Sequence, residues 1–399
     1  MPELWKKHCL DININDTKHK YTNNTKVLKM IYRNDQWSKV FDEDLQYIVS
    51  NCRSDLKKIS NKSLLFTGGG GFLGYYFYHV ISKWNKENKK NNIFYTVLDN
   101  KLLKKNSWIT KTKSNQNIKF VFKDINSVSQ KFIKDFDIIV HGASIASPTF
   151  YRKYPIETMK ANIGGLWNIL KSFESNNSKK NMLKKLIFFS SSEVYGNPGK
   201  NNIPTKEDYV GNVSFTGPRA CYDESKRFGE TLVLNYSNIY KFNSVIIRPF
   251  NNYGPGMSLN DKRIIPDLMK NVLNNEDMIL FSNGAPKRTF CYIADSITSY
   301  IKAISKGKNL NAYNIGTSSP EISMKELTIT IKDIAKSLYD YKGKCIFKIN
   351  KDKEYLKDNP LRRKPCLKKT TKHLKFKSKI SLNKGLKNTL IYFNNLKNK

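Results

Sequence analysis

Short apolar runs alternate with longer segments of helical periodicity from residue 61 onward. Six of the runs are typical of buried strands, because their apolar side chains follow one another without the polar alternation of a half-exposed strand. They lie at residues 63–67, 95–98, 119–122, 137–140, 186–190 and 244–248. Between them, residues 72–84, 157–174 and 222–240 carry apolar side chains at helical spacing. Repeated strand–helix units predict an α/β fold with a doubly wound parallel sheet that helices cover on both faces.

The same pattern divides the chain into three parts. Residues 1–60 form an N-terminal extension whose second part predicts an amphipathic helix, which packs on the following domain or binds a partner. The apolar positions of that helix are Leu45, Ile48, Val49, Cys52 and Leu56. Residues 61–248 hold the predicted sheet, and the shorter, mixed elements beyond them predict a smaller mixed α/β domain over residues 249–399, with some segments returning to the first domain. The Lys-rich tail keeps a helical apolar pattern at Leu386, Leu390, Ile391 and Phe393.

Composition excludes two classes of protein. Hydrophobic residues make up 39% of the 399 residues, more than a disordered chain carries, and no apolar run reaches the ~20 residues that span a bilayer. The net charge is +37, but the excess is mostly Lys, spread along the chain and mixed with Asn. This spread indicates a compositional bias rather than a nucleic-acid partner, although a positive field attracts a phosphorylated, acidic small molecule.

Cysteine and histidine positions bear on compartment and metal binding. Cysteines stand at positions 9, 52, 221, 291, 345 and 366 without a Cys-x-x-Cys pair, and the five histidines are scattered. Neither set has the spacing of metal ligands. With no apolar signal-peptide core at the N-terminus, we expect a reduced, metal-free, cytoplasmic protein.

A glycine-rich turn follows the first predicted strand and opens a predicted helix. The run Thr67-Gly68-Gly69-Gly70-Gly71-Phe72-Leu73-Gly74 lets the backbone and the helix N-terminus approach a pyrophosphate, which indicates a Rossmann-type dinucleotide site. Asp99 ends the second strand, where a carboxylate accepts hydrogen bonds from ribose hydroxyls and repels a 2′-phosphate, so NAD is favoured over NADP. Asp124 ends the third strand and either meets the adenine end or caps a helix.

Two further motifs carry candidate chemistry. Tyr222 and Lys226 lie at i and i+4 on one helix face, where an ammonium lowers the pKa of a phenol and makes it a usable base. About thirty residues earlier, the run 190–196 reads Ser-Ser-Ser-Glu-Val-Tyr-Gly and leaves a strand at the carboxyl edge of the sheet, where doubly wound proteins bind ligands. A Ser/Glu cap of the following segment is the alternative interpretation of that run.

Together these motifs resemble the extended short-chain dehydrogenase/reductases that act on nucleotide sugars, over about residues 61–395. Within that family the chain is most similar to UDP-glucuronate decarboxylases (UDP-xylose synthases), through residues 143–148, 217–224, 261–265, 288–292 and 362–365. The resemblance implies that bound NAD oxidises the sugar C4 hydroxyl, that the resulting β-keto acid loses CO₂, and that C4 is then reduced again. Residues 249–399 would mainly bind the nucleotide sugar, and the family suggests a homodimer.

The resemblance also implies roles for individual residues. Tyr222 resembles the base at the C4 hydroxyl, Lys226 its pKa partner, and Ser191 the hydroxyl that orients O4. Ser192 and Glu193 resemble the pair beside the C5 carboxylate, and Arg363 the arginine that binds it. Glu193 would shift that carboxylate out of the sugar plane or assist proton delivery after CO₂ leaves. The implied substrate contacts are Tyr151, Glu193, Asn251, Arg263, Arg288, Tyr292 and Arg363. The implied cofactor contacts are Gly68, Gly71, Phe72, Leu73, Gly74, Asp99, Asn100, Asp124, Ile125, Ala143, Tyr222 and Lys226.

Some features depart from the family, and alternatives remain open. The family usually has His-Leu-Ala where this chain has His141-Gly142-Ala143, and the segment after Asn100 is rich in Lys. A 4,6-dehydratase or a 4-epimerase would use much of the same machinery. Arg363 favours a uronate over a neutral hexose, because a carboxylate requires a cation. A different class altogether would be a non-catalytic protein that binds NAD or RNA.

Overall fold

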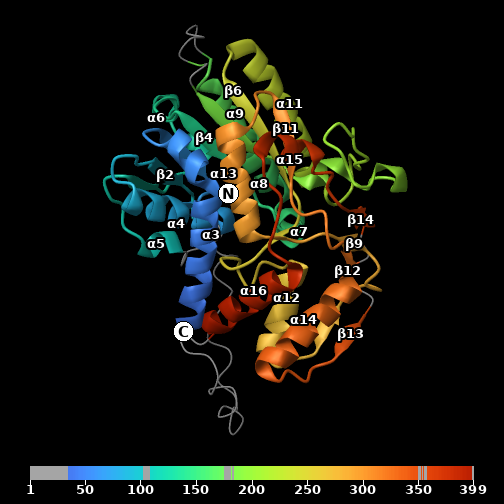
Figure 1. Cartoon of the computed structure of the whole chain (residues 1–399). Helices are drawn as coiled ribbons and strands as arrows, with labels where there is room; N and C mark the ends of the chain where they lie inside the picture. The colour runs from blue at the N-terminus through green and yellow to red at the C-terminus, as the bar shows by residue number, and fades with distance from the viewer. Residues whose placement is uncertain are drawn as a thin grey trace, which may run out of the picture.

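The computed structural model describes residues 35–101, 108–174, 181, 184–348, 352, 354 and 357–397. Seven parallel strands form its central sheet in the order β11-β6-β5-β4-β1-β2-β3 (Figure 1). These strands are β1 (Ser63–Thr67), β2 (Phe94–Leu98), β3 (Ile118–Val121), β4 (Ile138–His141), β5 (Lys185–Phe189), β6 (Asn243–Pro249) and β11 (Asn311–Ile315). The doubly wound parallel sheet is therefore confirmed, and each of the six predicted strands lies within one residue of its expected ends.

Side chains on the two faces of the sheet enter two separate cores. In β1, Leu64 and Phe66 pack into one core and Leu65 into the other, as expected for a strand buried on both faces. Helices α4 (Phe72–Glu87) and α13 (Ile293–Lys306) cover the first face, and α6 (Gln130–Lys134), α9 (Gly165–Lys171) and α11 (Ala220–Tyr240) the second. The predicted helix at 157–174 is one segment made of α8 (Pro155–Met159), the π-helical turn η2 (Lys160–Gly164) and α9. The remaining short elements of this part are α5 (Trp108–Lys111), η1 (Ile125–Ser127), α7 (Pro148–Lys153), η3 (Ser192–Tyr195) and η4 (Lys200–Asn202).

The N-terminal extension contributes one long helix, α3 (Asp35–Ile59), which lies along α13 in Figure 1. Its apolar face, including the five predicted positions, joins the same core as α4 and α13. Polar ties accompany this packing: the Tyr47 hydroxyl donates to Asp295 at 2.6 Å, and Asp55 pairs with Lys302 at 3.0 Å. The interpretation of this segment as a helix that packs on the following domain is confirmed, whereas the first 34 residues lie outside the described part.

A second, smaller lobe follows β6 and sits at the lower end of the molecule in Figure 1. Its sheets are small and mixed: β12-β9-β14, β13-β8 and β10-β7. Their strands are β7 (Asn252–Tyr253), β8 (Met278–Leu280), β9 (Lys287–Arg288), β10 (Cys291–Tyr292), β12 (Ile322–Ser323), β13 (Cys345–Phe347) and β14 (Arg362–Arg363). Helices α12 (Ile264–Leu273), α14 (Met324–Tyr339) and α16 (Leu382–Lys397) pack against one another, while α15 (Lys368–Leu374) lies against β11. The helix predicted in the tail is α16, and its four apolar positions are buried.

Two segments beyond residue 248 belong to the large sheet rather than to the smaller lobe. Strand β11 pairs with β6 in parallel register, from Asn311 opposite Val245 to Ile315 opposite Pro249. Helix α13 packs on the same face of the sheet as α4. None of the helices in the described ranges combines the length and apolar character needed to cross a membrane.

Candidate active site

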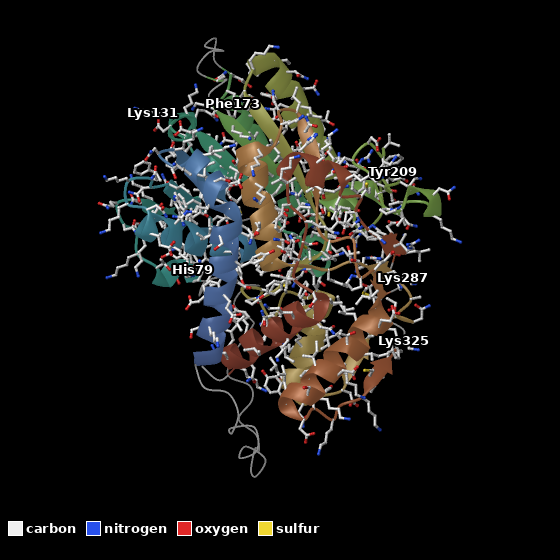
Figure 2. The ribbon with its side chains drawn as sticks, in the orientation of Figure 1. His79, Lys131, Phe173, Tyr209, Lys287 and Lys325 are labelled. Atoms are coloured by element: carbon white, nitrogen blue, oxygen red, sulfur yellow. The ribbon has the colours of Figure 1, made fainter. Side chains whose placement is uncertain are left out.

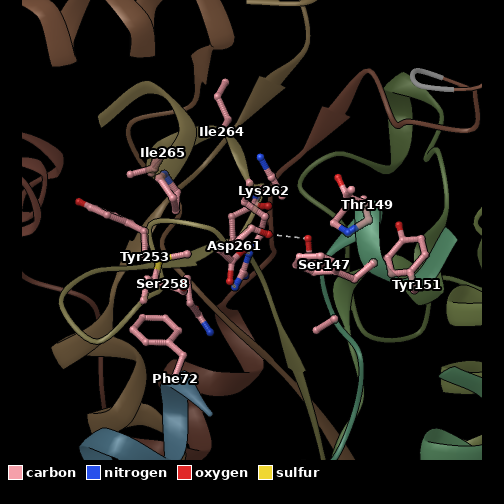
Figure 3. A pocket seen from close by; sticks show the side chains of 18 of the residues that line it. Phe72, Ser147, Thr149, Tyr151, Tyr253, Ser258, Asp261, Lys262, Ile264 and Ile265 are labelled. Atoms are coloured by element: carbon pink, nitrogen blue, oxygen red, sulfur yellow. Dashed lines mark hydrogen bonds and ion pairs between the residues drawn. The ribbon is translucent and has the colours of Figure 1, made fainter. Parts of the chain in front are cut away.

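A cavity of about 1770 Å³ opens where the carboxyl ends of β1, β4 and β5 face the smaller lobe. Figure 3 shows Tyr151 of α7 on one side of the cavity and Asp261 and Lys262 of the loop before α12 facing it. Phe72 of α4 lies on the same side as that loop, below Ser258. The Ser147 hydroxyl donates to the Asp261 carbonyl across the cavity at 2.7 Å, which joins the two sides. Fifteen of the predicted site residues line this cavity: Gly68, Gly71, Phe72, Leu73, Asn100, Tyr151, Ser191, Ser192, Glu193, Tyr222, Lys226, Asn251, Arg263, Arg288 and Arg363.

The glycine-rich loop lies at the point where the strand order reverses, between β1 and β4. Gly68 has a φ of +69°, and a Cβ there would lie 2.6 Å from the backbone of Ala143. A Cβ on Gly74 would lie 1.9 Å from the Gly69 carbonyl oxygen, so that glycine lets α4 pack directly on the loop. The N-cap of α4, Gly71, has no side-chain cap and lines the cavity. A helix N-terminus open to a cavity in this way fits a pyrophosphate.

Besides Asp99, four predicted cofactor residues do not line the cavity. Gly74 and Ala143 pack against the loop backbone, and Ile125 is buried in the core on the far face of the sheet. Asp124 caps η1 by accepting the Asn126 N–H at 2.8 Å and also accepts Asn100 Nδ2 at 3.0 Å. The capping interpretation of Asp124 is thus the one its contacts support.

Asp99 holds the turn after β2. Its carboxylate accepts the Gly70 N–H at 2.9 Å and the Lys101 N–H at 2.8 Å. The carboxylate therefore stands between the glycine loop and Asn100, the next residue, which does line the cavity. A ribose bound over this loop would meet Asp99 at the position that the motif predicts.

Tyr222 lies in the first turn of α11 and is buried against Tyr151. The two rings stack with their centroids 4.9 Å apart and their planes 14° from parallel. Burial raises the pKa of Tyr222 to about 12, although a hydrogen bond with Ser191 lowers it. Ser191 in turn accepts the Glu193 N–H at 3.2 Å, so the hydroxyl beside the phenol is held by the turn that begins η3.

Lys226 is placed one helical turn from Tyr222, as the sequence predicts. Its ammonium donates to the Phe189 carbonyl at 2.9 Å and lies 5.7 Å from the centroid of the Tyr222 ring. Burial lowers the pKa of Lys226 to about 7. Burial is the largest influence on the pKa of each of these two groups, and the expectation that Lys226 lowers the pKa of Tyr222 stays a prediction.

Glu193 is held between two arginines. Arg363, from β14 in the smaller lobe, binds both carboxylate oxygens, with one contact at 2.7 Å from Nη2 to Oε2. Arg219, which immediately precedes α11, donates to Oε2 as well. Burial alone would raise the pKa of Glu193, but the two guanidiniums hold it well below its usual range. The two guanidiniums therefore favour the ionised form of this carboxyl group.

Three other predicted substrate residues, Arg288, Arg263 and Asn251, already form hydrogen bonds within the protein. Arg288 donates to the carbonyl of Pro360 at 2.6 Å and to Asn359 Oδ1 at 3.0 Å, so its guanidinium is turned toward its own lobe. Arg263 forms a bidentate pair with Asp261. Asn251 Nδ2 donates to the Thr289 carbonyl at 3.1 Å. All three line the cavity, and each would have to exchange a present partner for a diphosphate oxygen.

Tyr292 is placed outside the cavity, which corrects its assignment as a substrate contact. Its hydroxyl donates to Asp44 of α3 at 2.7 Å, and its side chain is buried among helices. Thr289 and Phe290 separate β9, which carries Arg288, from β10, which carries Tyr292. Residues at the two positions therefore face different surroundings.

Arg219 is the site residue that sequence reasoning missed. A signal was present, since Arg219 precedes Tyr222 by three positions and Lys226 by seven and stands at the N-cap of α11, the helix that carries both. Its guanidinium carbon lies 5.7 Å from the Tyr151 ring centroid, and its Nε lies 3.7 Å from Asp223. Within the described ranges, no cluster of His, Cys, Asp and Glu is arranged to hold a metal ion.

Comparisons with known proteins agree with this geometry. Residues 64–316 match the model of the NAD dependent epimerase/dehydratase family. The chain is 32% identical over 327 residues to UDP-glucuronic acid decarboxylase 6 of Arabidopsis thaliana, covering 82% of this chain and 87% of that protein. It is 30% identical over 338 residues to UDP-glucuronic acid decarboxylase 1 of Xenopus tropicalis, covering 85% of this chain and 73% of that protein.

Solved structures show the same fold. UDP-glucuronic acid 4-epimerase of Bacillus cereus, in complex with UDP-glucuronic acid and NAD, aligns with a TM-score of 0.68 at 22% identity, over 84% of this chain and 99% of that one. dTDP-glucose 4,6-dehydratase of Bacillus anthracis, in complex with NAD, aligns with a TM-score of 0.65 at 22% identity, over 83% and 96%. With its glycine loop, its Tyr-Lys pair and these relatives, the chain belongs to the NAD dependent epimerase/dehydratase family and is an NAD-dependent enzyme that modifies nucleotide sugars.

Proposed function

We propose that this enzyme decarboxylates UDP-glucuronate to UDP-xylose. The observation that carries the proposal is the buried guanidinium pair, Arg219 and Arg363, beside the stacked Tyr151 and Tyr222. Two buried cations next to the candidate base suit a substrate that brings a carboxylate, and a neutral hexose needs neither. The likeness to UDP-glucuronic acid decarboxylases over more than four-fifths of the chain supports the same reaction.

The residues at the cavity suggest how the reaction would proceed. Tyr222 would take the proton of the C4 hydroxyl, with Ser191 orienting that oxygen through the hydrogen bond it shares with the phenol. Loss of the C4 hydrogen leaves a ketone β to the carboxylate, so the C5–carboxylate bond breaks with release of CO₂ and its electron pair forms an enolate. The enolate takes a proton at C5, and Tyr222 returns its proton to O4 when C4 is reduced.

The cofactor we propose is NAD, held by the loop of residues 68–74 and by Asp99. When bound, it would accept hydride from C4 and later return it. The observations that support this site are the crowding that only glycine tolerates at positions 68 and 74 and the uncapped N-terminus of α4. Residues 61–248 would mainly hold this cofactor and residues 249–399 the nucleotide sugar.

Two related reactions are the alternatives to decarboxylation as the function of this enzyme. A 4,6-dehydratase needs a carboxylate base at C5, and the ionised Glu193 has that character, although its neighbour is Ser192 rather than an acid. A 4-epimerase that acts on a uronate would also use the two arginines, as the UDP-glucuronic acid 4-epimerase fold relative illustrates. The three reactions differ in product mass or in sugar stereochemistry.

The test is to incubate the purified protein with NAD and, separately, UDP-glucuronate, UDP-glucose, dTDP-glucose and GDP-mannose, and to identify products by mass spectrometry and NMR. We expect loss of CO₂ from UDP-glucuronate alone. Loss of water from a neutral hexose would instead establish the dehydratase, and an isomer of unchanged mass the epimerase. Tyr222→Phe protein serves as the control for background reactions.

We also propose a homodimer and a cytoplasmic location. Four apolar side chains stand exposed on the neighbouring helices α8, α9 and α11: Ile156, Met159, Trp167 and Phe228. A two-fold axis would pair this face with the same face of a second copy, since isologous interfaces are self-complementary.

The five cysteines in the described part are free, which agrees with the proposed cytoplasmic location, a reducing compartment.

A further inference from the structure

The cluster around Glu193 holds more positive than negative charge. Arg219 and Arg363 both bind the Glu193 carboxylate, and Arg288 stands opposite Arg363 in the β9–β14 register. All three arginine side chains are buried. Burial, and then the charge of Arg363, lowers the pKa of Arg288 to about 9, as expected where guanidiniums crowd together.

The remaining carboxyl group nearby does not balance these charges. Asp223 lies 3.7 Å from Arg219 Nε, and its Oδ1 has no hydrogen-bond partner. Burial, with the charge of Glu193 next, raises the pKa of Asp223, which disfavours its ionised form. Among the described residues, Glu193 is thus the carboxylate that hydrogen-bonds to guanidiniums of this cluster, and it binds two of the three.

The two arginines also keep unused donors. The Nε atoms of Arg219 and Arg363 are both buried without a hydrogen-bond partner. A guanidinium presents five N–H donors, and a buried donor without an acceptor is unfavourable. A second carboxylate would supply acceptors for these donors and reduce the excess charge of the cluster.

We propose that Arg219 and Arg363 form one anion seat for which the Glu193 side chain and the carboxylate of a uronate substrate compete, which makes Arg219 a specificity-determining residue. The inference rests on the proposed function in taking the substrate to be a uronate, and it goes further in assigning Arg219 and the competing role of Glu193. In this arrangement Glu193 keeps the arginines apart and paired until a substrate carboxylate takes over part of its contacts.

The experiment measures binding without turnover. Isothermal titration calorimetry compares UDP, UDP-glucose and UDP-glucuronate on the NAD-loaded Tyr222→Phe protein, into which Arg219→Gln, Glu193→Gln or Arg362→Gln is then introduced. Arg362 is the matched control: it neighbours Arg363 but forms a bidentate pair with Glu321, at 2.8 and 2.7 Å, on a partly exposed surface. The quantity compared is the ratio of the Kd for UDP-glucose to the Kd for UDP-glucuronate.

The proposal predicts opposite changes for the two sides of the seat. Arg219→Gln should lower the ratio by about ten- to hundredfold, the range for a lost hydrogen bond to a charged group. Glu193→Gln should raise the ratio, because the neutral amide competes less well for the arginines. Arg362→Gln should leave the ratio unchanged, and UDP alone should bind all variants equally.

Two results would overturn the proposal. If Arg219→Gln weakens UDP-glucose and UDP-glucuronate equally, Arg219 only supports the fold. If Glu193→Gln lowers the ratio, Glu193 assists the carboxylate instead of competing with it; this isosteric variant keeps the test decisive even where Arg219→Gln does not fold.

The outcome is separable from that of the proposed function. CO₂ release by the wild-type enzyme is measured in parallel with UDP-glucuronate. An enzyme that releases no CO₂ yet shows the Arg219-dependent preference binds a uronate for another reaction, and the seat stands. An enzyme that releases CO₂ without that preference retains the proposed function, and the seat is refuted.

Discussion

Burial shifts the pKa values of Tyr222 and Lys226 more than their neighbours do. Tyr222 has its pKa raised to about 12 and Lys226 has its pKa lowered to about 7, both mainly by desolvation. With its pKa raised, the phenol of Tyr222 ionises less readily than in water, and with its pKa lowered, the amine of Lys226 is less fully protonated than in water. A positively charged nicotinamide bound beside them would favour the phenolate, so the pair needs the cofactor to act as a base.

Replacing Tyr222 with Phe should abolish turnover while leaving nucleotide binding intact. The phenol oxygen is the group proposed to take the C4 proton, and its removal should lower the rate of the first oxidation by about 10²–10⁴-fold or more. The rise in NADH absorbance in a single turnover measures this step. Binding of UDP to the variant, measured by calorimetry, is the control for folding. NADH formation at the normal rate would assign the base to another residue.

Replacing Asp99 with Ala should relax the preference for NAD over NADP. Asp99 follows β2 and accepts the N–H of Gly70 in the glycine loop and that of Lys101, so its loss should weaken NAD binding and remove repulsion of a 2′-phosphate. We expect the NAD/NADP ratio of Kd values to change by roughly ten- to hundredfold. Asp124→Ala is the matched control, because that carboxylate also follows a strand but caps η1. An unchanged ratio in Asp99→Ala would place the ribose elsewhere.

Site residues could be predicted from the sequence where a motif is local and could not where the contact is distant. The glycine loop, Ser191 with Glu193, and Tyr222 with Lys226 are each contained within a few positions, so they form local motifs, and the family resemblance then suggests their roles. The pairing of Glu193 with Arg363 joins residues 170 positions apart, and no periodicity records it. Arg219 was within a quoted motif but had no assigned partner until the fold brought Glu193 beside it.

At the scale of elements, the strands were predicted well because burial on both faces leaves continuous apolar runs. The helix α3 was also predictable from its apolar spacing, but its polar contacts were not. Asp44 of α3 accepts hydrogen bonds from Tyr292 of β10 at 2.7 Å and from Tyr76 of α4 at 3.0 Å. One carboxylate thus connects the N-terminal extension to the helix of the cofactor loop and to the smaller lobe.

Replacing Asp44 with Asn should flatten the dependence of stability on pH. Burial raises the pKa of Asp44 to about 7 in the folded protein, against about 4 in an exposed carboxyl group. Because the folded state then binds the proton more tightly, the contribution of Asp44 to stability is fully present below pH ~4 and is lost as pH rises to about 7. Asp44→Asn keeps an acceptor for the two phenols without this loss.

Thermal unfolding measured between pH 5 and pH 8 checks this effect. The midpoint of Asp44→Asn relative to wild type should rise over that interval. Asp42→Asn, an exposed carboxylate on the same helix, should show no such trend. A parallel shift of Asp44→Asn at all pH values would mean that the carboxyl group does not titrate there.

For the whole molecule, the dominant property is a net charge of +37. Figure 2 shows Lys131 at the upper left of the molecule and Lys287 and Lys325 together at its lower right, so lysines stand on both lobes. A positive field of this kind attracts an anionic small molecule such as a nucleotide sugar with its two phosphates. It does not by itself indicate that the protein recognises a nucleic-acid sequence. The same charge makes two copies of the chain repel each other.

The proposed dimer should therefore become tighter as salt concentration rises. Apolar association through Ile156, Met159, Trp167 and Phe228 works against the repulsion between two chains of charge +37, and salt screens that repulsion. Trp167→Asp should shift the protein to a monomer in analytical ultracentrifugation, because the carboxylate would be buried at the interface. Ile329→Asp, at an exposed apolar position on α14 in the other lobe, is the matched control and should leave the dimer unchanged. A monomeric wild type at high salt would refute the dimer, whereas association that weakens with salt would indicate that charged contacts hold the two copies together instead of this apolar face.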